Sequence, residues 1–264
     1  MPGILAPIRR FPLTAFTVLA CVFGWIAQII GLFRGSTTTD QLPLGPIIAA
    51  AIVSACLGRP GLSDWWRRLT TVRAAPRWYL LAFVAPIGLM VLAVLVNTAL
   101  GAPSPTRAQL SGWTGLPAEF LGIFIFIGIG EEAGWTAFAA PRLLGRHRFL
   151  VAFLIIAAIR VFWHLPLMLA GELPPLVGVV ANAGFQFMVL WAFFRSGGAW
   201  LLAAIWHAVH NTLSGSFFFR MVEGADQARL GLVLTAVYWL AVTAVLLVDR
   251  KLLAAPRPSA RLPV

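Results

Sequence analysis

A small set of ionisable side chains lies inside the long apolar stretches of this 264-residue chain. They are Glu131, Glu132, Arg160, His164, His207 and His210, with Asn182, Gln186 and Asn211 as uncharged polar companions. Ionisable groups at membrane depth are costly, so each one is a functional candidate. A carboxylate can accept a proton from water, and imidazoles can stabilise an oxyanion or bind a metal. If these groups meet in one water-filled cleft, they predict hydrolytic chemistry.

Helical spacing sorts these candidates. His207 and Asn211 are four residues apart and share a helix face, so both can address one substrate atom, whereas His210 points to the side. Glu131 and Glu132 are adjacent, about 100° apart around a helix axis, so only one can face the reacting centre directly. We therefore expect one carboxylate to act on the substrate or water and its neighbour to orient it.

Three of the polar residues are expected to be structural. Asn182 and Gln186 are also four residues apart, and side chains of this kind commonly form hydrogen bonds between membrane helices. We interpret His210 as a flanking residue.

The elements that position these residues are membrane helices. The chain is 60% apolar and 11% charged, far from the roughly 45–50% and 25% of soluble domains. This composition excludes an ordinary soluble enzyme. Both cysteines, Cys21 and Cys56, lie in apolar runs and predict neither a disulfide framework nor a zinc cluster.

Apolar stretches of about 20 residues can cross a bilayer. The sequence contains eight candidates, at roughly 12–33, 42–57, 78–100, 114–130, 149–170, 175–194, 198–215 and 230–248. We predict an all-α, polytopic membrane protein with about eight helices in one bundle, forming a single membrane domain over residues 1–264. The hydrophilic connection 58–77 and the two residues that follow it carry aromatic side chains expected to anchor at the membrane interface, namely Trp65, Trp66, Trp78 and Tyr79.

Charge predicts the orientation of this bundle. The chain has 20 basic and 9 acidic residues, a net charge of +11. If the N-terminus is cytoplasmic, fifteen of the basic residues fall in cytoplasmic segments and four outside, and Arg160 lies within a span. This positive-inside bias predicts that both termini are cytoplasmic. The basicity then reflects topology and contact with membrane lipids, and no nucleic-acid partner is expected. The predominance of arginine over lysine indicates a GC-rich bacterial genome, so we expect the protein in a bacterial inner (plasma) membrane.

Three motifs in this chain resemble those of a known family. They are Gly130-Glu131-Glu132-Ala133-Gly134-Trp135-Thr136-Ala137-Phe138, Phe162-Trp163-His164-Leu165-Pro166 and His207-Ala208-Val209-His210-Asn211. They are similar to the E-E-x-x-x-R, F-x-x-x-H and H-x-x-x-N motifs of the CAAX-protease and bacteriocin-processing (CPBP, or Abi) intramembrane proteases. The resemblance covers about 130–212, within a family-like catalytic core at about 114–215.

The resemblance implies an activity and a role for each motif residue. It implies an endopeptidase with an intramembrane site open toward lipid and cytoplasm, acting on a membrane-associated or lipidated protein or peptide. Glu131 would be the general base on water, with His164 helping to hold that water and Glu132 supporting them. His207 and Asn211 would form the oxyanion hole.

The resemblance leaves the use of a metal open. The family has been described both as metallopeptidases and as metal-independent enzymes. Glu131, His164 and His207 would make a chemically reasonable zinc site with one water.

Two positions depart from the family motifs. Thr136 stands where the first motif has arginine, and Arg160 stands where the second has phenylalanine. We hypothesise that Arg160 supplies the positive charge that the motif arginine would supply at position 136. Arg160 lies four residues before His164 on the same helix face. The loss of the motif arginine also leaves open a catalytically inactive binding, immunity or scaffold protein. A more distant alternative is a proton-coupled transporter.

Overall fold

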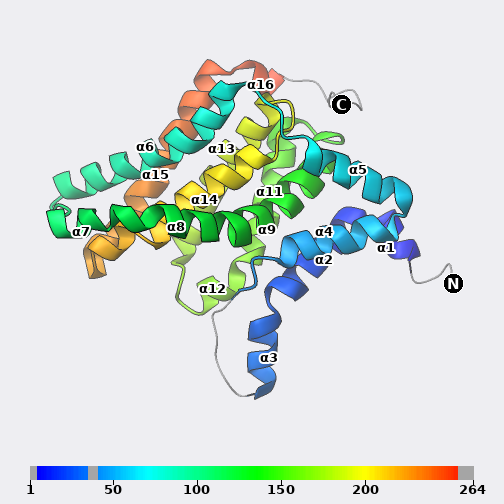
Figure 1. Ribbon diagram of the computed structural model, residues 1–264, viewed down its shortest axis with the longest axis horizontal. Coiled ribbons are helices and arrows are strands. Elements are labelled where there is room, and N and C mark those ends of the chain that lie inside the picture. Colours follow the sequence, from blue (N-terminus) through cyan, green and yellow to red (C-terminus); the bar gives the residue numbers. More distant parts are fainter. Residues whose placement is uncertain (1–4, 35–40, 255–264) are drawn as a thin grey trace.

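The computed structural model describes residues 5–34 and 41–254, and every secondary-structure element in these ranges is a helix (Figure 1). The α-helices are α1 (Ala6–Arg10), α2 (Pro12–Gly24), α3 (Ile26–Arg34), α4 (Gly45–Cys56), α5 (Arg59–Thr70), α6 (Pro76–Ala99), α7 (Arg107–Ser111), α8 (Leu116–Ile123), α9 (Gly130–Gly134), α10 (Ala140–Leu144), α11 (Phe149–Trp163), α12 (Leu165–Leu169), α13 (Asn182–Arg195), α14 (Leu201–Gly215), α15 (Gly224–Val248) and α16 (Lys251–Ala254). The 3-10 helices are η1 (Gly112–Gly115) and η5 (Phe218–Met221), and the π-helical segments are η2 (Phe124–Ile129), η3 (Trp135–Ala139) and η4 (Val177–Ala181). The expected all-α membrane fold is confirmed.

All eight expected apolar segments are helical, but their lengths differ. Four helical stretches in the described residues are long and apolar enough to cross a membrane: Pro76–Ala99, Arg107–Leu144, Val177–Arg195 and Gly224–Val248. Pro12–Gly24, Gly45–Cys56 and Phe149–Trp163 are shorter apolar helices. At 1.5 Å per residue, a helix of 12 to 15 residues extends only about 18–22 Å. These helices are therefore shorter than the roughly 30 Å hydrocarbon core of a bilayer.

The first expected span, 12–33, is divided at Trp25. The Trp25 indole and the Gln41 amide both donate to the carbonyl oxygen of Trp163, at 2.8 Å and 2.6 Å. The last carbonyl groups of a helix have no partner within that helix. The two side chains thus satisfy the C-terminal end of α11, the turn that holds His164.

The stretch 107–144 is the central element, and the Glu131-Glu132 pair lies between its two π-helical segments, η2 and η3. Such segments are rare and often occur at functional sites. Two glycines let neighbouring helices approach its backbone. A Cβ at Gly134 would lie 2.5 Å from the carbonyl oxygen of Pro46, and one at Gly128 would lie 2.7 Å from that of Ala204. Small residues at these positions bring α4 and α14 into close contact with this stretch.

The expectation that Trp65, Trp66, Trp78 and Tyr79 are all interfacial anchors is wrong for Trp65. This side chain is only 9% exposed and its indole donates to the carbonyl oxygen of Ala133 at 3.0 Å, whereas Trp66 is 67% exposed. Consecutive residues of α5 point about 100° apart, so one tryptophan packs against the central helix and the next faces outward.

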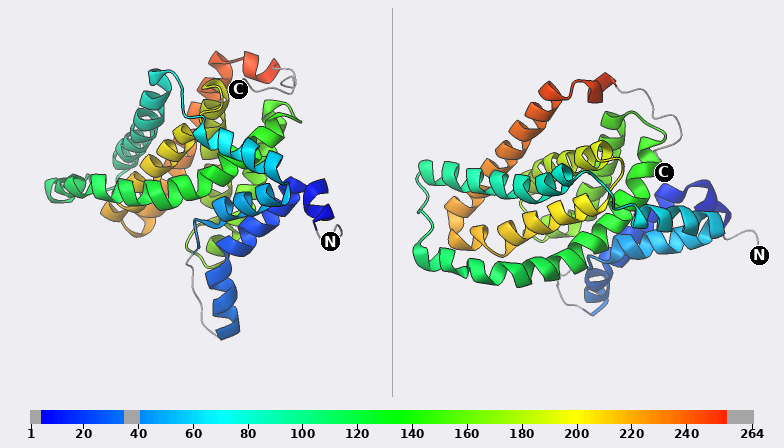
Figure 2. Two further views of the ribbon diagram at one scale, coloured as in Figure 1. Left: turned by 45° about the vertical axis from the view of Figure 1, so that its right-hand side comes forward. Right: turned by 45° about the horizontal axis from the view of Figure 1, so that its top comes forward.

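The connections between helices gather at two ends of the bundle. We call one the basic end: the connections 57–75, 145–148 and 196–200. Arg142 lies 3.5 Å from Asp64, and the Trp200 indole donates to the Leu69 carbonyl at 2.9 Å, which joins these segments. The other, which we call the distal end, comprises the connections 100–106, 164–176 and 216–223. Figures 1 and 2 show α7 and α12 well away from α5 and α16.

Candidate active site

Glu132 is fully buried and both of its carboxylate oxygens are used. Its Oε1 accepts hydrogen bonds from Arg160 Nη1 at 2.8 Å and from His207 Nδ1 at 2.9 Å. Its Oε2 accepts from the Thr136 hydroxyl one helical turn away. Glu132 therefore joins three helical segments as a buried counter-ion.

Glu131 has a different environment, although it is only 4% exposed. Its Oε2 accepts from the Trp135 indole and from Arg160 Nη2, both at 3.3 Å. No hydrogen bond from the described residues reaches its Oε1. The side chain lines a cavity of about 710 Å³. One oxygen is thus held in place while the other is available to water in the cavity.

Arg160 links the two carboxylates and is 2% exposed. Besides Glu131 and Glu132, it donates to Gln186 Oε1 at 2.9 Å, and its guanidinium carbon lies 5.4 Å from the centre of the Phe185 ring. A guanidinium has five donors in a fixed plane, which suits this multiple pairing. One cation from α11 therefore ties α9 to α13.

The two motif histidines each have one ring nitrogen fixed. His164 Nδ1 lies 2.8 Å from the carbonyl oxygen of Arg160. Because a carbonyl only accepts hydrogen bonds, this Nδ1 carries the proton, so Nε2 of the neutral ring is an acceptor. His207 Nδ1 similarly faces the Glu132 carboxylate. Both histidines line the same cavity as Glu131, and each has its Nε2 left for substrate or water.

The cavity brings together four of the five predicted catalytic residues. Glu131, His164, His207 and Asn211 all line it. Glu132 and the two predicted supporting residues, Thr136 and Arg160, are not among its lining residues; they contact the others through hydrogen bonds.

Two residues of this neighbourhood were not predicted as parts of the site. Gln186 was expected only as a hydrogen bond between helices; that bond goes to Arg160, at the centre of the charged cluster. Tyr238 was not singled out, yet its hydroxyl lies 2.9 Å from His210 Nδ1 and both residues line the cavity. Tyr238 is one of only two tyrosines in the chain, which is a weak sequence indication.

The expectation for Asn182 is wrong. Its amide donates to the carbonyl oxygen of Gly178 at 2.7 Å, four residues earlier on the same helical stretch. A short amide side chain can reach the preceding turn of its own backbone, so it needs no partner on another helix.

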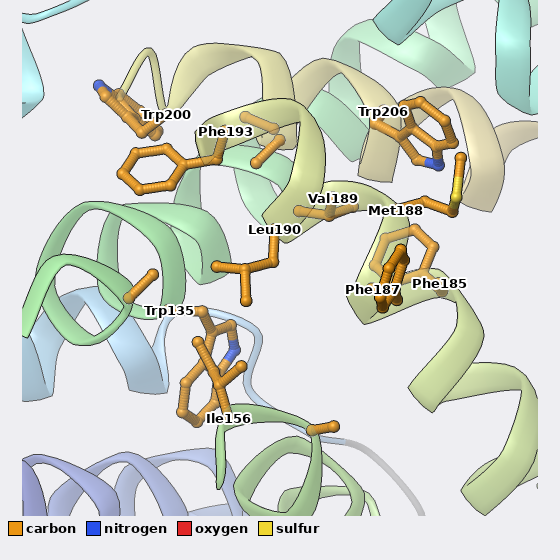
Figure 3. Close-up of a cluster of buried hydrophobic side chains, with 14 of the residues drawn as sticks. Trp135, Ile156, Phe185, Phe187, Met188, Val189, Leu190, Phe193, Trp200 and Trp206 are labelled. Carbon is orange, nitrogen blue, oxygen red and sulfur yellow. The ribbon is translucent and has the colours of Figure 1, made fainter. Parts of the chain in front are cut away.

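Rigid apolar packing surrounds the cluster. Buried Trp135, Ile156 and Leu190 come from three different helical segments of the core drawn in Figure 3. The Trp135 ring also packs edge-on against Trp163, with centroids 6.0 Å apart. In such a dry surrounding, charges and dipoles act on one another more strongly than in water.

A metal ion could be held here by a set different from the expected one. Ligand atoms of Glu131, Glu132 and His207 lie within 4.8 Å of one another, and His164 is outside this group. Carboxylate and imidazole are suitable zinc ligands. The Arg160 guanidinium, however, already donates to both carboxylates. A metal would have to compete with a fixed cation for the same oxygens.

Residues 113–213 match the family model described as "Type II CAAX prenyl endopeptidase Rce1-like". A comparison with curated proteins finds no matching sequence. The matched range contains all three motifs and the buried charged cluster. The resemblance to the CPBP family is confirmed over this range.

Proposed function

We propose that this membrane protein, whose residues 113–213 form an Rce1-like domain of the CPBP family, hydrolyses peptide bonds with water activated by Glu131. The observation that carries the proposal is the contrast between the two carboxylates. Glu132 has both oxygens bonded, whereas Glu131 lines the cavity with its Oε1 unbonded to the described residues. A general base must be able to reach the proton it removes.

The proposed reaction begins with a water between Glu131 and His164. His164 Nε2 accepts one hydrogen bond from this water, which orients it, while Glu131 removes the other proton as the oxygen attacks the peptide carbonyl carbon. The protonated Glu131 then delivers that proton to the leaving amine when the C–N bond breaks. These steps need no further acid.

The oxyanion formed by this attack is stabilised by His207 and Asn211. With both of its nitrogens protonated, His207 donates from Nδ1 to Glu132 and from Nε2 to the oxyanion. The Asn211 amide donates from the same helix face, four residues on. Donors fixed in advance are an effective way to stabilise charge that develops in a transition state.

Arg160 and Glu132 are proposed as positioning residues. The Arg160 guanidinium lies 2.8 Å from Glu132 and 3.3 Å from Glu131, so one buried cation compensates both carboxylates. In this proposal Arg160 supplies the positive charge that Thr136 cannot supply at the motif position.

Zinc held by Glu131, Glu132 and His207 would polarise the substrate carbonyl and acidify a bound water. Because Arg160 occupies the same carboxylates, none of the proposed steps uses a metal.

The proposal is tested by comparing new peptide termini in membranes from cells that produce the wild type, Glu131→Gln or Glu223→Gln at matched levels. Glu223 is an exposed residue outside the cavity, so its variant controls for loss of a carboxylate. We expect wild-type termini to disappear in Glu131→Gln and to persist in Glu223→Gln.

Zinc determination on the purified wild type and Glu131→Gln decides how water is activated. If termini do not differ and Glu131→Gln retains the cellular phenotype of the wild type, the chain acts by binding and is not a protease.

A further inference from the structure

The catalytic cavity extends from the buried charged cluster toward one end of the bundle. Glu131 and His207 lie at its buried part, and its outer walls include Glu172, Ser216 and Arg220. These three residues belong to the connections 164–176 and 216–223. The cavity therefore reaches the distal end of the bundle.

The basic end makes no contribution to this cavity. Within the described residues, none of the cavity-lining side chains comes from the connections 57–75, 145–148 or 196–200. A second hollow shares Pro43, Ile123 and Ile127 with the cavity and continues to Gly115 and Glu119. Both hollows thus occupy the same half of the molecule.

The charges of the two ends differ in sign as well as in number. The three connections of the basic end, 57–75, 145–148 and 196–200, contain six arginines and one acidic residue, Asp64. The three connections of the distal end, 100–106, 164–176 and 216–223, contain one arginine, Arg220, and two acidic residues, Glu172 and Glu223. An excess of arginine marks the cytoplasmic side of a membrane protein. The distal end would then face away from the cytoplasm.

We propose that the substrate reaches Glu131 from the extracytoplasmic side. The inference rests on the proposed protease function and specifies its substrate class: membrane-anchored or exported polypeptides with an accessible segment outside the cytoplasmic membrane. A polypeptide whose cleavable segment stays in the cytoplasm would meet the basic end, where the cavity has no lining residues. This differs from the cytoplasmic opening that the family resemblance implies.

The first part of the test measures sidedness without using activity. Single cysteines are introduced by Ser216→Cys at the cavity, Ser104→Cys at the distal end outside the cavity, and Ala75→Cys at the basic end, in a Cys21→Ala, Cys56→Ser background. Ser104 and Ala75 are exposed and Ser216 is partly exposed. A membrane-impermeant maleimide linked to polyethylene glycol is added to intact spheroplasts and to permeabilised ones. We expect Ser216→Cys and Ser104→Cys to react in both preparations, and Ala75→Cys only after permeabilisation.

The second part uses the same reagent as a block. Termini that depend on Glu131 are counted for each cysteine variant before and after labelling of intact spheroplasts. We expect labelling of Ser216→Cys to reduce them at least tenfold and labelling of Ser104→Cys to leave them unchanged. The termini themselves should map to extracytoplasmic segments.

The outcomes separate the two proposals. If Glu131-dependent termini exist but map to cytoplasmic segments, or if Ser216→Cys reacts only after permeabilisation, the inference on sidedness is wrong while the protease function stands. If no Glu131-dependent termini exist, both the proposed protease function and the proposed substrate class are wrong.

Discussion

Two regions of this protein join acidic residues to arginines, and they do so in opposite surroundings. In the buried cluster, the side chains of Glu131, Glu132 and Arg160 are at most 5% exposed. At the basic end, Asp64 pairs with Arg67 and Arg68 of its own helix, and its side chain is 28% exposed. The ionic chemistry is the same, but the ion pairs of the first region are shielded from bulk solvent, whereas those of the second are partly exposed to it.

This difference determines what each region can contribute. Exposed ion pairs typically contribute about 0–1 kcal/mol, because water and salt screen them. Removing one partner of a buried pair costs about 3–5 kcal/mol, because the other charge is left without compensation. The buried cluster therefore makes its members depend on one another, and the basic end does not.

The largest effect is expected for Arg160→Leu. This change leaves Glu131 and Glu132 without their common cation, so we expect a loss of about 3–5 kcal/mol in stability and loss of proteolysis. Thermal unfolding in detergent and counting of peptide termini measure the two effects, with Arg73→Leu as an exposed-arginine control. A folded and fully active Arg160→Leu protein would show that the guanidinium has no role in the site.

The two adjacent glutamates should separate activity from stability. Glu131→Gln should lower the cleavage rate by about 10²–10⁴-fold, the usual contribution of a general base. It should lower the stability less than Glu132→Gln does, because both hydrogen bonds of Glu131 are long, at 3.3 Å. Glu132→Gln should lower the stability by about 1.5–3 kcal/mol, because its hydrogen bonds to charged groups weaken. Unfolding curves of both variants, measured beside the wild type, provide the comparison. Equal losses of stability would contradict the distinct roles assigned to these carboxylates.

A smaller effect is expected for Thr136→Val, which removes the hydroxyl that donates to Glu132 and keeps the shape of the side chain. We expect a loss of about 1–2 kcal/mol, with proteolysis retained in the folded protein. Thr136→Ser is the matched control because it keeps the hydroxyl. A complete loss of activity at unchanged stability would assign Thr136 a catalytic role.

The smallest effect is expected at the basic end, for Asp64→Asn. Partial burial by itself would raise the pKa of the Asp64 carboxyl, but the hydrogen bond and charge of Arg68, with the charges of Arg142 and Arg67, hold that pKa below its ordinary value of 3.8. A lowered pKa in the folded state stabilises the protein above the unfolded pKa, and this contribution is lost as the pH falls through the folded pKa.

We therefore expect Asp64→Asn to cost less than about 1 kcal/mol at pH 7, and its difference from the wild type to shrink below about pH 4. Unfolding measured at both pH values tests this. A difference that grows on acidification would contradict the expected direction of the pKa shift.

Hydropathy and residue type along the chain indicate which residues could do chemistry and predict the helices that hold them. Glu131, His164, His207 and Asn211 were identified because polar groups inside apolar runs are conspicuous, and hydropathy and charge bias are properties of a short stretch of chain. The all-α membrane fold followed from the same local information.

Which of these groups contact one another depends on how the helices pack. Sequence spacing shows that Glu131 and Glu132 point in different directions, but only packing assigns Glu131 to the cavity and Glu132 to Arg160 and His207. Packing also buries Trp65 and places the cavity at the distal end, and the Asn182 amide bonds to a carbonyl of its own helix. Which side chains form hydrogen bonds with each carboxylate depends on the rotation and separation of whole helices. These quantities are set by packing between segments far apart in the chain, which local periodicity does not contain.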